Sequence, residues 1–239
     1  MLTNKTLLII FSLIYVVGLA FLYFSKVRMN NSENRIYKIM IITNIIGLIL
    51  QLCCDYISYR NDILPHIISD VIYRLYMIYF IIFINLMLLY LMTISSKTLK
   101  KTFIIIDTIL CIVEILIVSL SSYELYSDVS NKVYYTFGPA IDLTFIISGI
   151  ICVFMVLILI YNFKKISKKK SIPIYLLIIS GTVSALIQHS NPEILIITSM
   201  ESFICCLMYF TIENPDMKML NEMTLARNQA EKANRAKSD

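Results

Sequence analysis

Long apolar runs constrain this chain more than any other feature of its sequence. Seven stretches of predominantly apolar residues follow one another along the 239 residues, and each is bounded by charged or turn-forming residues. A helix needs about 20 apolar residues to cross roughly 30 Å of hydrocarbon. The runs therefore predict an all-α membrane protein built as a seven-transmembrane-helix bundle. They cover residues 6–25, 39–57, 67–94, 103–120, 141–161, 172–187 and 194–212, of which the sixth is the shortest.

The composition excludes a soluble globular enzyme. Hydrophobic residues make up 58% of the chain and charged residues 15%, which leaves too little polar surface to enclose a core in water. The first run is too long for a cleaved signal peptide and lacks a small-residue cleavage site, so we expect a retained first span. The six cysteines lie within or beside the apolar runs, as is typical of small buried residues.

Positive charge is distributed unevenly between the loops, and this predicts the orientation. Short loops rich in lysine and arginine stay on the cytoplasmic side of a membrane. The first, third and fifth loops carry 12 such residues, whereas the segments on the opposite side carry three, Lys5, Arg60 and Lys132. We therefore expect the amino terminus outside and the segment after residue 212 in the cytoplasm. The 12 residues are Lys26, Arg28, Arg35, Lys38, Lys97, Lys100, Lys101, Lys164, Lys165, Lys168, Lys169 and Lys170.

The composition changes abruptly after the seventh run, at the helix-breaking pair Asn214-Pro215. We expect a membrane domain at 1–213 and a cytoplasmic linker helix at 214–239. Apolar residues of the linker are spaced alternately by four and three positions, which is the spacing along the seam of a two-stranded coiled coil. An amphipathic helix on the inner leaflet is the alternative. The seam residues are Met219, Met223, Ala226, Ala230 and Ala233.

The linker resembles the juxtamembrane segment of multi-span bacterial sensor histidine kinases. The matching residues are Thr-Ile-Glu-Asn-Pro-Asp-Met-Lys-Met-Leu at 211–220 and Ala-Glu-Lys-Ala-Asn-Arg-Ala-Lys-Ser-Asp at 230–239. In that family the phosphoacceptor-histidine box would follow, so the resemblance implies a chain that ends just before it. It also implies a homodimer in the bacterial cell membrane, a response regulator as partner of the missing kinase core, and ATP and Mg²⁺ as cofactors of that core alone.

The membrane domain is similar to the seven-span amino-terminal region of such kinases. The similarity rests on Tyr134-Tyr135-Thr136-Phe137-Gly138-Pro139, which is similar to the Tyr-Gly-Pro turn before the fifth span of that group. Here Thr136-Phe137 separates the tyrosines from Gly-Pro, and the tryptophan that often follows in that group is absent. A local Gly-Pro turn before a helix is the equally weighted alternative.

No residue pattern predicts catalysis or metal binding within this chain. His66 and His189, the two histidines, both lie toward the outer side of the expected bundle, and neither is followed by the residues of a phosphoacceptor box. With five glycines in the whole chain, no glycine-rich nucleotide loop is present. Any enzymatic activity would thus belong to a longer parent protein.

Ionisable residues within the apolar runs are candidates for a ligand pocket or a switch, because burying charge in a membrane is costly. The alternative is that they only hold helices together, and Asp70 and Arg74, four positions apart, can pair on one helix face. The outer tyrosines, Tyr134 and Tyr135 among them, could line a pocket, although an interfacial tyrosine belt is the favoured interpretation. The candidates within the runs are Asp70, Arg74, Asp107, Glu114 and Glu201.

The expected function is the sensing and transmission of a stimulus across a membrane. Its partners would be the lipid bilayer and an unknown extracellular or membrane ligand, with no role for nucleic acid. One alternative is a small membrane transporter or transporter subunit. Another keeps the sensor and replaces the kinase by a different cytoplasmic output, such as a cyclic-dinucleotide synthase. A retinal-binding protein is excluded, because residues 194–212 contain no lysine for the Schiff base.

Overall fold

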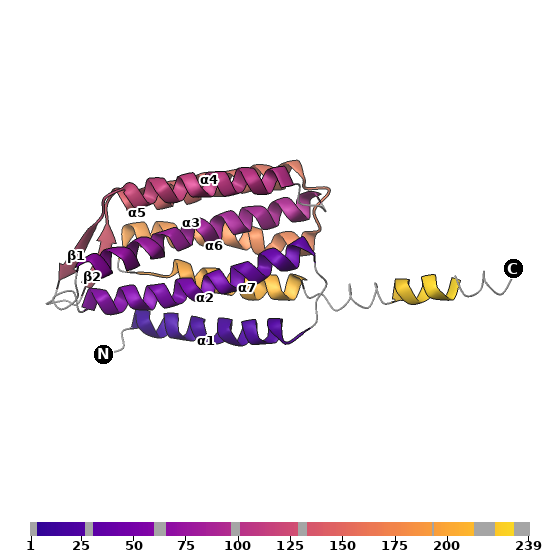
Figure 1. Cartoon of the computed structure of the whole chain (residues 1–239), viewed down its shortest axis with the longest axis horizontal. Coiled ribbons are helices and arrows are strands. Elements are labelled where there is room, and N and C mark those ends of the chain that lie inside the picture. Colours follow the sequence, from indigo (N-terminus) through magenta and orange to yellow (C-terminus); the bar gives the residue numbers. More distant parts are fainter. Residues whose placement is uncertain are drawn as a thin grey trace.

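The computed structural model is a bundle of seven helices with a short β-hairpin at one end (Figure 1). It describes residues 4–26, 31–59, 66–96, 101–128, 133–192, 194–212 and 223–231. The helices of the bundle run roughly along one common axis, and the hairpin connects α4 with α5. In chain order the helices are α1 (Asn4–Phe24), α2 (Ser32–Tyr59), α3 (His66–Ser96), α4 (Lys101–Leu120), α5 (Pro139–Tyr161), α6 (Lys168–Ser190) and α7 (Ile197–Ile212).

Six of these helices, α1 to α6, are long and apolar enough to cross a membrane. Each coincides with one of the apolar runs, and the structure therefore supports a membrane protein. The sixth run is short in the sequence, but α6 has 23 residues. Helix α6 includes Lys168–Lys170 at its start and Gln188 and His189 near its end. These polar residues end the apolar run but do not end the helix. The shortest helix is instead α7, with 16 residues.

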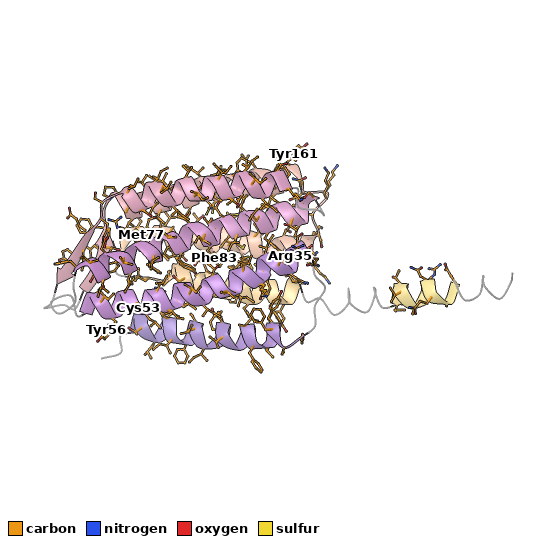
Figure 2. The ribbon with its side chains drawn as sticks, in the orientation of Figure 1. Arg35, Cys53, Tyr56, Met77, Phe83 and Tyr161 are labelled. Atoms are coloured by element: carbon orange, nitrogen blue, oxygen red, sulfur yellow. The ribbon has the colours of Figure 1, made fainter. Side chains whose placement is uncertain are left out.

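Helix α3 lies at the centre of the bundle and packs against α2, α4, α5 and α6. Large side chains such as Phe83, Met87 and Tyr90 are fully buried along it. Helix α4 lies at the rim and buries only Asp107 and Val118. Figure 2 shows side chains extending outward from the helices over the whole length of the bundle. Many of those exposed side chains are apolar, as expected for helices that face lipid rather than water.

Helix α7 is held in the bundle by side chains of α1 and α2 that donate hydrogen bonds to its backbone or to the backbone just before it. The Tyr15 hydroxyl donates to the carbonyl of Ser199 at 3.2 Å. The Tyr37 hydroxyl donates to the carbonyl of Cys205 at 2.7 Å. The Gln51 Nε2 donates to the carbonyl of Leu195 at 3.3 Å, just before α7 begins. These bonds attach the first half of the short helix to α1 and α2.

The hairpin is the element that the sequence analysis did not predict. Strands β1 (Glu124–Asp128) and β2 (Val133–Phe137) pair antiparallel, with Tyr126 opposite Tyr135. The rings of this pair stack at a centroid distance of 4.8 Å, which is a common way to stabilise a two-stranded pair. Gly138 then adopts a φ of 111° and Pro139 opens α5. The Gly-Pro pair thus ends the hairpin and starts a helix, as both interpretations of this segment expect.

The expected linker helix is described only at 223–231, where its residues are helical and exposed. Arg227 Nε donates to Glu231 Oε1 at 3.0 Å along this segment. Met223, Ala226 and Ala230 of the proposed coiled-coil seam lie on it. Met219 and Ala233 lie outside the described residues. The pairing of this segment with a second chain stays a prediction.

Candidate functional site

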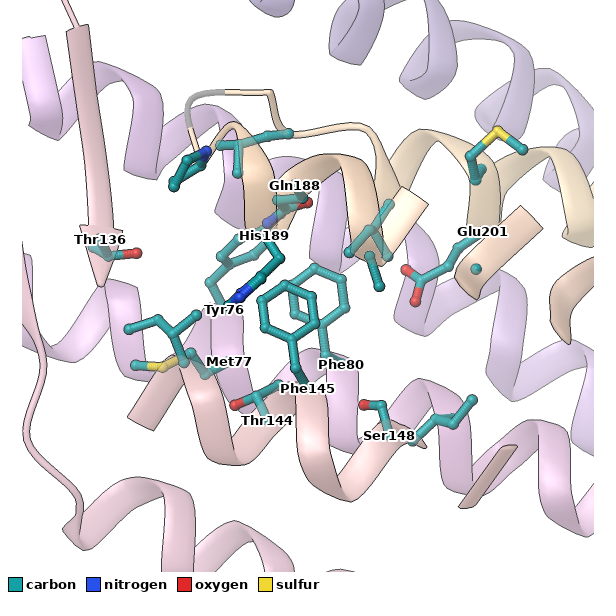
Figure 3. Close-up of a pocket in the computed structure, with 18 of the residues that line it drawn as sticks. Tyr76, Met77, Phe80, Thr136, Thr144, Phe145, Ser148, Gln188, His189 and Glu201 are labelled. Carbon is teal, nitrogen blue, oxygen red and sulfur yellow. The ribbon is translucent and has the colours of Figure 1, made fainter. Parts of the chain in front are cut away.

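A large cleft opens toward the hairpin end of the bundle, between α2, α3, α5, α6 and α7. Its volume is about 1120 Å³, comparable to sites that hold small organic ligands. Its walls combine apolar and aromatic side chains with a few polar groups. Figure 3 shows Phe80 from α3, Phe145 from α5 and His189 from α6 around the same space. The hairpin contributes Tyr135, Thr136 and Phe137 to the outer rim.

Glu201 is the deepest charged residue of this cleft. It lies in the first turns of α7, its side chain is directed toward the cleft (Figure 3), and only 6% of the residue is exposed. Its Oε2 accepts a hydrogen bond from the Tyr79 hydroxyl of α3. That hydroxyl in turn accepts from Asn44 Nδ2 of α2 at 3.0 Å. The carboxylate therefore joins three helices at the point where the cleft wall meets the core.

The same polar centre is closed by Ser202, which follows Glu201 on α7. The Ser202 hydroxyl lies 2.9 Å from Asn44 Oδ1, to which it donates. Beside this centre, the hydroxyls of Tyr76 on α3 and Thr198 on α7 are 2.9 Å apart. Helices α2, α3 and α7 are thus connected by a hydrogen-bonded network of buried side chains. A network of this kind fixes one arrangement of the helices, because each group would be costly to leave unpaired.

Gly47 of α2 makes room for the ring of Tyr79. A Cβ atom built on Gly47 would lie 2.2 Å from two ring carbons of Tyr79, well inside van der Waals contact. A larger residue at position 47 would thus displace the ring whose hydroxyl holds Glu201. The hydrogen-bonded network therefore requires a glycine at position 47, as does the packing of α2 against α3.

Asp70 and Arg74 do pair on one face of α3, with 3.0 Å between Asp70 Oδ2 and Arg74 Nε. Arg74 Nη1 also donates to the carbonyls of Ser119 at 2.5 Å and Ser121 at 3.1 Å. These carbonyls lie at the carboxyl end of α4, where a cation is favourable. Burial raises the pKa of Tyr123, and the hydrogen bond with Asp70 raises it further. Neither Asp70 nor Arg74 lines the cleft, so the structure places this pair at a helix junction.

Asp107 and Glu114 both lie on α4, away from the cleft. Glu114 Oε2 accepts from Asn85 Nδ2 of α3 at 2.7 Å. Asp107 is 8% exposed, and its Oδ1 has no hydrogen-bond partner among the described residues. Of the five ionisable candidates, only Glu201 therefore lies in the cleft. Of the two tyrosines, Tyr135 lines it, and the side chain of Tyr134 lies outside the described part of the structure.

Metal binding finds no support in the described residues, which contain no group of three or more histidine, cysteine, aspartate or glutamate side chains able to hold an ion. All six cysteines are free thiols. Of the adjacent pairs, Cys54 and Cys205 are buried, and Cys53 and Cys206 are partly buried.

The sequence analysis missed the partners of Glu201. Asn44, Tyr79 and Ser202 are polar residues inside apolar runs, and each is buried. Single polar residues in a membrane helix often face a neighbouring helix, and this would have been the signal to follow. The sequence alone does not show which helices these residues connect, because that depends on how the helices pack in the bundle.

The comparisons with known proteins add nothing to this geometry. No protein-family model, curated protein or solved structure matches the chain.

Proposed function

We propose that this chain is the membrane sensor and signal-transmission region of a bacterial sensor histidine kinase. The observation that carries the proposal is the position of Glu201. It faces the cleft, it is bonded to α3 and through Tyr79 to α2, and it lies on α7, which leads directly into the segment that resembles the kinase linker.

In this proposal α7 is the seventh span. Its 16 residues cover about 24 Å at 1.5 Å per residue, and the residues 194–196 before it extend that length toward the hairpin end. The hairpin end faces outward and the lysine-rich loops lie in the cytoplasm. The unequal distribution of positive charge supports this orientation.

The transmission step follows from the network. A ligand that enters the cleft and competes for Glu201 changes the hydrogen bond that connects α7 to α3 and α2. Helix α7 then shifts or rotates slightly against these helices, which is a common form of switching between packed helices. The linker passes the movement to the kinase core of a homodimer. A seam that ends in alanines tolerates such small rotations with little loss of packing.

The test fuses residues 1–239 to a histidine kinase core that lacks its own sensor, in membrane vesicles. We expect Glu201→Gln to change the rate of autophosphorylation at unchanged abundance in the membrane, because the amide weakens the hydrogen bond from Tyr79. Glu114→Gln is the matched control, since Glu114 is also an acid within a membrane helix, and it lies on α4, which packs mainly against α3 and α5. Equal rates in all three proteins would contradict the proposal.

A further inference from the structure

The polar and apolar residues of the cleft are separated along its length. Two of its three acidic residues, Asp55 near the end of α2 and Asp142 in the first turn of α5, lie toward the hairpin. The third, Glu201, lies farther along the cleft (Figure 3). Gln188 and His189, near the end of α6, also lie toward the hairpin (Figure 3). The opposite half is lined by apolar side chains from three helices, which are Ile84, Cys152, Val156, Leu177 and Ile178.

The polar half is suited to a positively charged group. No lysine or arginine occurs among the described residues that line the cleft, and His189 is the one basic side chain. Opposite charge is favourable at short range in a site of low polarity. Gln188 Oε1 is buried and has no hydrogen-bond donor within the described part of the chain, and such an acceptor is costly to leave unpaired. Both observations indicate a ligand that brings positive charge and N–H donors.

The apolar half is suited to a single hydrocarbon chain. The whole cleft, its polar half included, extends along α5 from Ile141 to Val156, a distance of roughly 20 Å along the helix at its usual rise. This is somewhat more than one leaflet of a bilayer, which is about half of 30 Å. The cleft as a whole is therefore long enough for a membrane amphiphile, head group and chain together.

The cleft also has an entrance from the side, between α5 and α6. Val153 on α5 and Leu186 on α6 line the cleft and are each more than 60% exposed. Gly149 and Gly181 line it as well, and a Cβ built on either would meet nothing within 4 Å. The boundary between these two helices is thus open, and an amphiphile could enter from the surrounding bilayer.

The geometry points to a binding site for a cationic single-chain amphiphile, with its amine in the part of the cleft between Asp142 and Gln188 on the hairpin side and Glu201 farther in, and its chain between α5 and α6. This inference deepens the proposed function and rests on it only for the consequence of binding. Binding itself is a property of the chain described above, with or without a kinase core.

The experiment uses the absence of tryptophan from the chain. Phe145→Trp places one fluorescent reporter in the cleft, and Phe21→Trp, at a position on α1 that is 74% exposed, reports on the bilayer alone. The full chain is placed in phosphatidylcholine nanodiscs and titrated with a long-chain primary amine that carries bromine atoms as quenchers. A brominated fatty acid of the same length is the control probe. Phe80→Trp is the second reporter if Phe145→Trp does not fold.

We expect the amine to quench the cleft reporter saturably, at a half-saturating concentration about tenfold below that of the fatty acid. Gly181→Leu fills the entrance and should raise that concentration by about tenfold or more. Gly18→Leu is its matched control, because Gly18 on α1 also has open space around it and does not line the cleft. At the Phe21→Trp position the two probes should quench alike and without saturation.

Three outcomes would overturn the inference. Equal affinity for both probes contradicts the charge of the head group. Equal quenching of the cleft and α1 reporters means that the amine only partitions into the bilayer. An unchanged half-saturating concentration of the amine in Gly181→Leu would mean that the amine does not enter between α5 and α6. If the amine binds and the autophosphorylation of the kinase fusion stays unchanged, the site stands and the proposed function fails. If Glu201→Gln alters autophosphorylation and no amine binds, the proposed function stands and the amphiphile site fails.

Discussion

At the scale of single residues, Tyr79 has the most demanding position in the bundle. Its hydroxyl donates to Glu201 and accepts from Asn44, and its ring lies against the backbone of Gly47. Tyr79 is therefore held both by its hydrogen bonds and by the close packing of its ring against α2. Separate substitutions should test the hydrogen bonds and the packing.

Tyr79→Phe removes the hydroxyl and leaves the ring in place. The Glu201 carboxylate loses the donor on α3, and a buried acceptor left unpaired costs about 1–3 kcal/mol. We expect a lower midpoint of thermal unfolding in detergent. Tyr175→Phe is the control, because Tyr175 is a partly exposed tyrosine on α6 whose hydroxyl should contribute little. Equal midpoints for both variants would show that the hydroxyl network does not stabilise the bundle.

Gly47→Ala tests the close packing of the Tyr79 ring against Gly47. The new methyl group would overlap the Tyr79 ring, and overpacking of this kind costs about 1–3 kcal/mol. Gly18→Ala adds the same methyl group to α1 in open space, where alanine favours a helix over glycine by about 1 kcal/mol. We therefore expect opposite shifts of the unfolding midpoint from the same chemical change. A destabilisation of similar size at both positions would contradict the close approach of Tyr79 to Gly47.

At the scale of elements, Arg74 connects the start of α3 to the end of α4. It donates to the carbonyl of Ser119 in the last turn of α4 and to the carbonyl of Ser121 just after α4, and its guanidinium lies 5.4 Å from the ring centroid of Tyr123. The arginine therefore fixes the point at which the chain leaves α4 and enters the hairpin.

Arg74→Gln should loosen this junction. Amide hydrogen exchange in the last turn of α4 and in β1 should become faster, because the carbonyls lose their donor and the helix end loses a favourable charge. Asp70→Asn removes the ion pair but keeps the arginine, so its effect should be clearly smaller. Exchange measured by mass spectrometry on peptides that cover residues 115–126 would show the difference. An equal effect of the two substitutions would mean that only the ion pair matters.

The elements themselves were largely predictable from the sequence. Each of the seven helices coincides with an apolar run, because length and hydropathy determine where a chain can cross a membrane. The hairpin was not predicted, since its ten strand residues in two short strands lie in a segment without the long periodicity of a helix. The cleft was not predictable either. It depends on the wide spacing of α5 and α6, and no local pattern reports the distance between two helices.

At the scale of the whole molecule, the two ends of the bundle differ in charge. Lys170 at the start of α6 pairs with Glu33 at the start of α2, with 2.6 Å between Lys170 Nζ and Glu33 Oε2. Arg35 and Tyr161 lie toward this end, and Cys53 and Tyr56 lie toward the hairpin (Figure 2). Lys26, Lys38 and Lys165 also lie toward the basic end, and Asp55 and Asp142 of the cleft lie toward the hairpin end.

This asymmetry predicts the topology. A reporter fused after Lys170 should be active only in the cytoplasm, and one fused after Asn131 only outside. A third fusion after Asp239 tests the crossing of α7 and should be cytoplasmic. An external reporter at that position, with the first two as expected, would mean that α7 enters the bundle without crossing and that the chain has six spans.

The manner in which α7 is held has a consequence for how this sequence can diverge. Tyr15, Tyr37 and Gln51 bind backbone carbonyls in and just before α7, and a carbonyl is present whatever side chain the residue carries. Substitutions at Leu195, Ser199 and Cys205 would leave these three acceptors intact. These three hydrogen bonds are thus specified by side chains of α1 and α2, whereas the hydrogen bonds of Thr198, Glu201 and Ser202 depend on side chains of α7 itself. A substitution at Leu195, Ser199 or Cys205 that preserves the packing can therefore leave the backbone attachment of the helix in place.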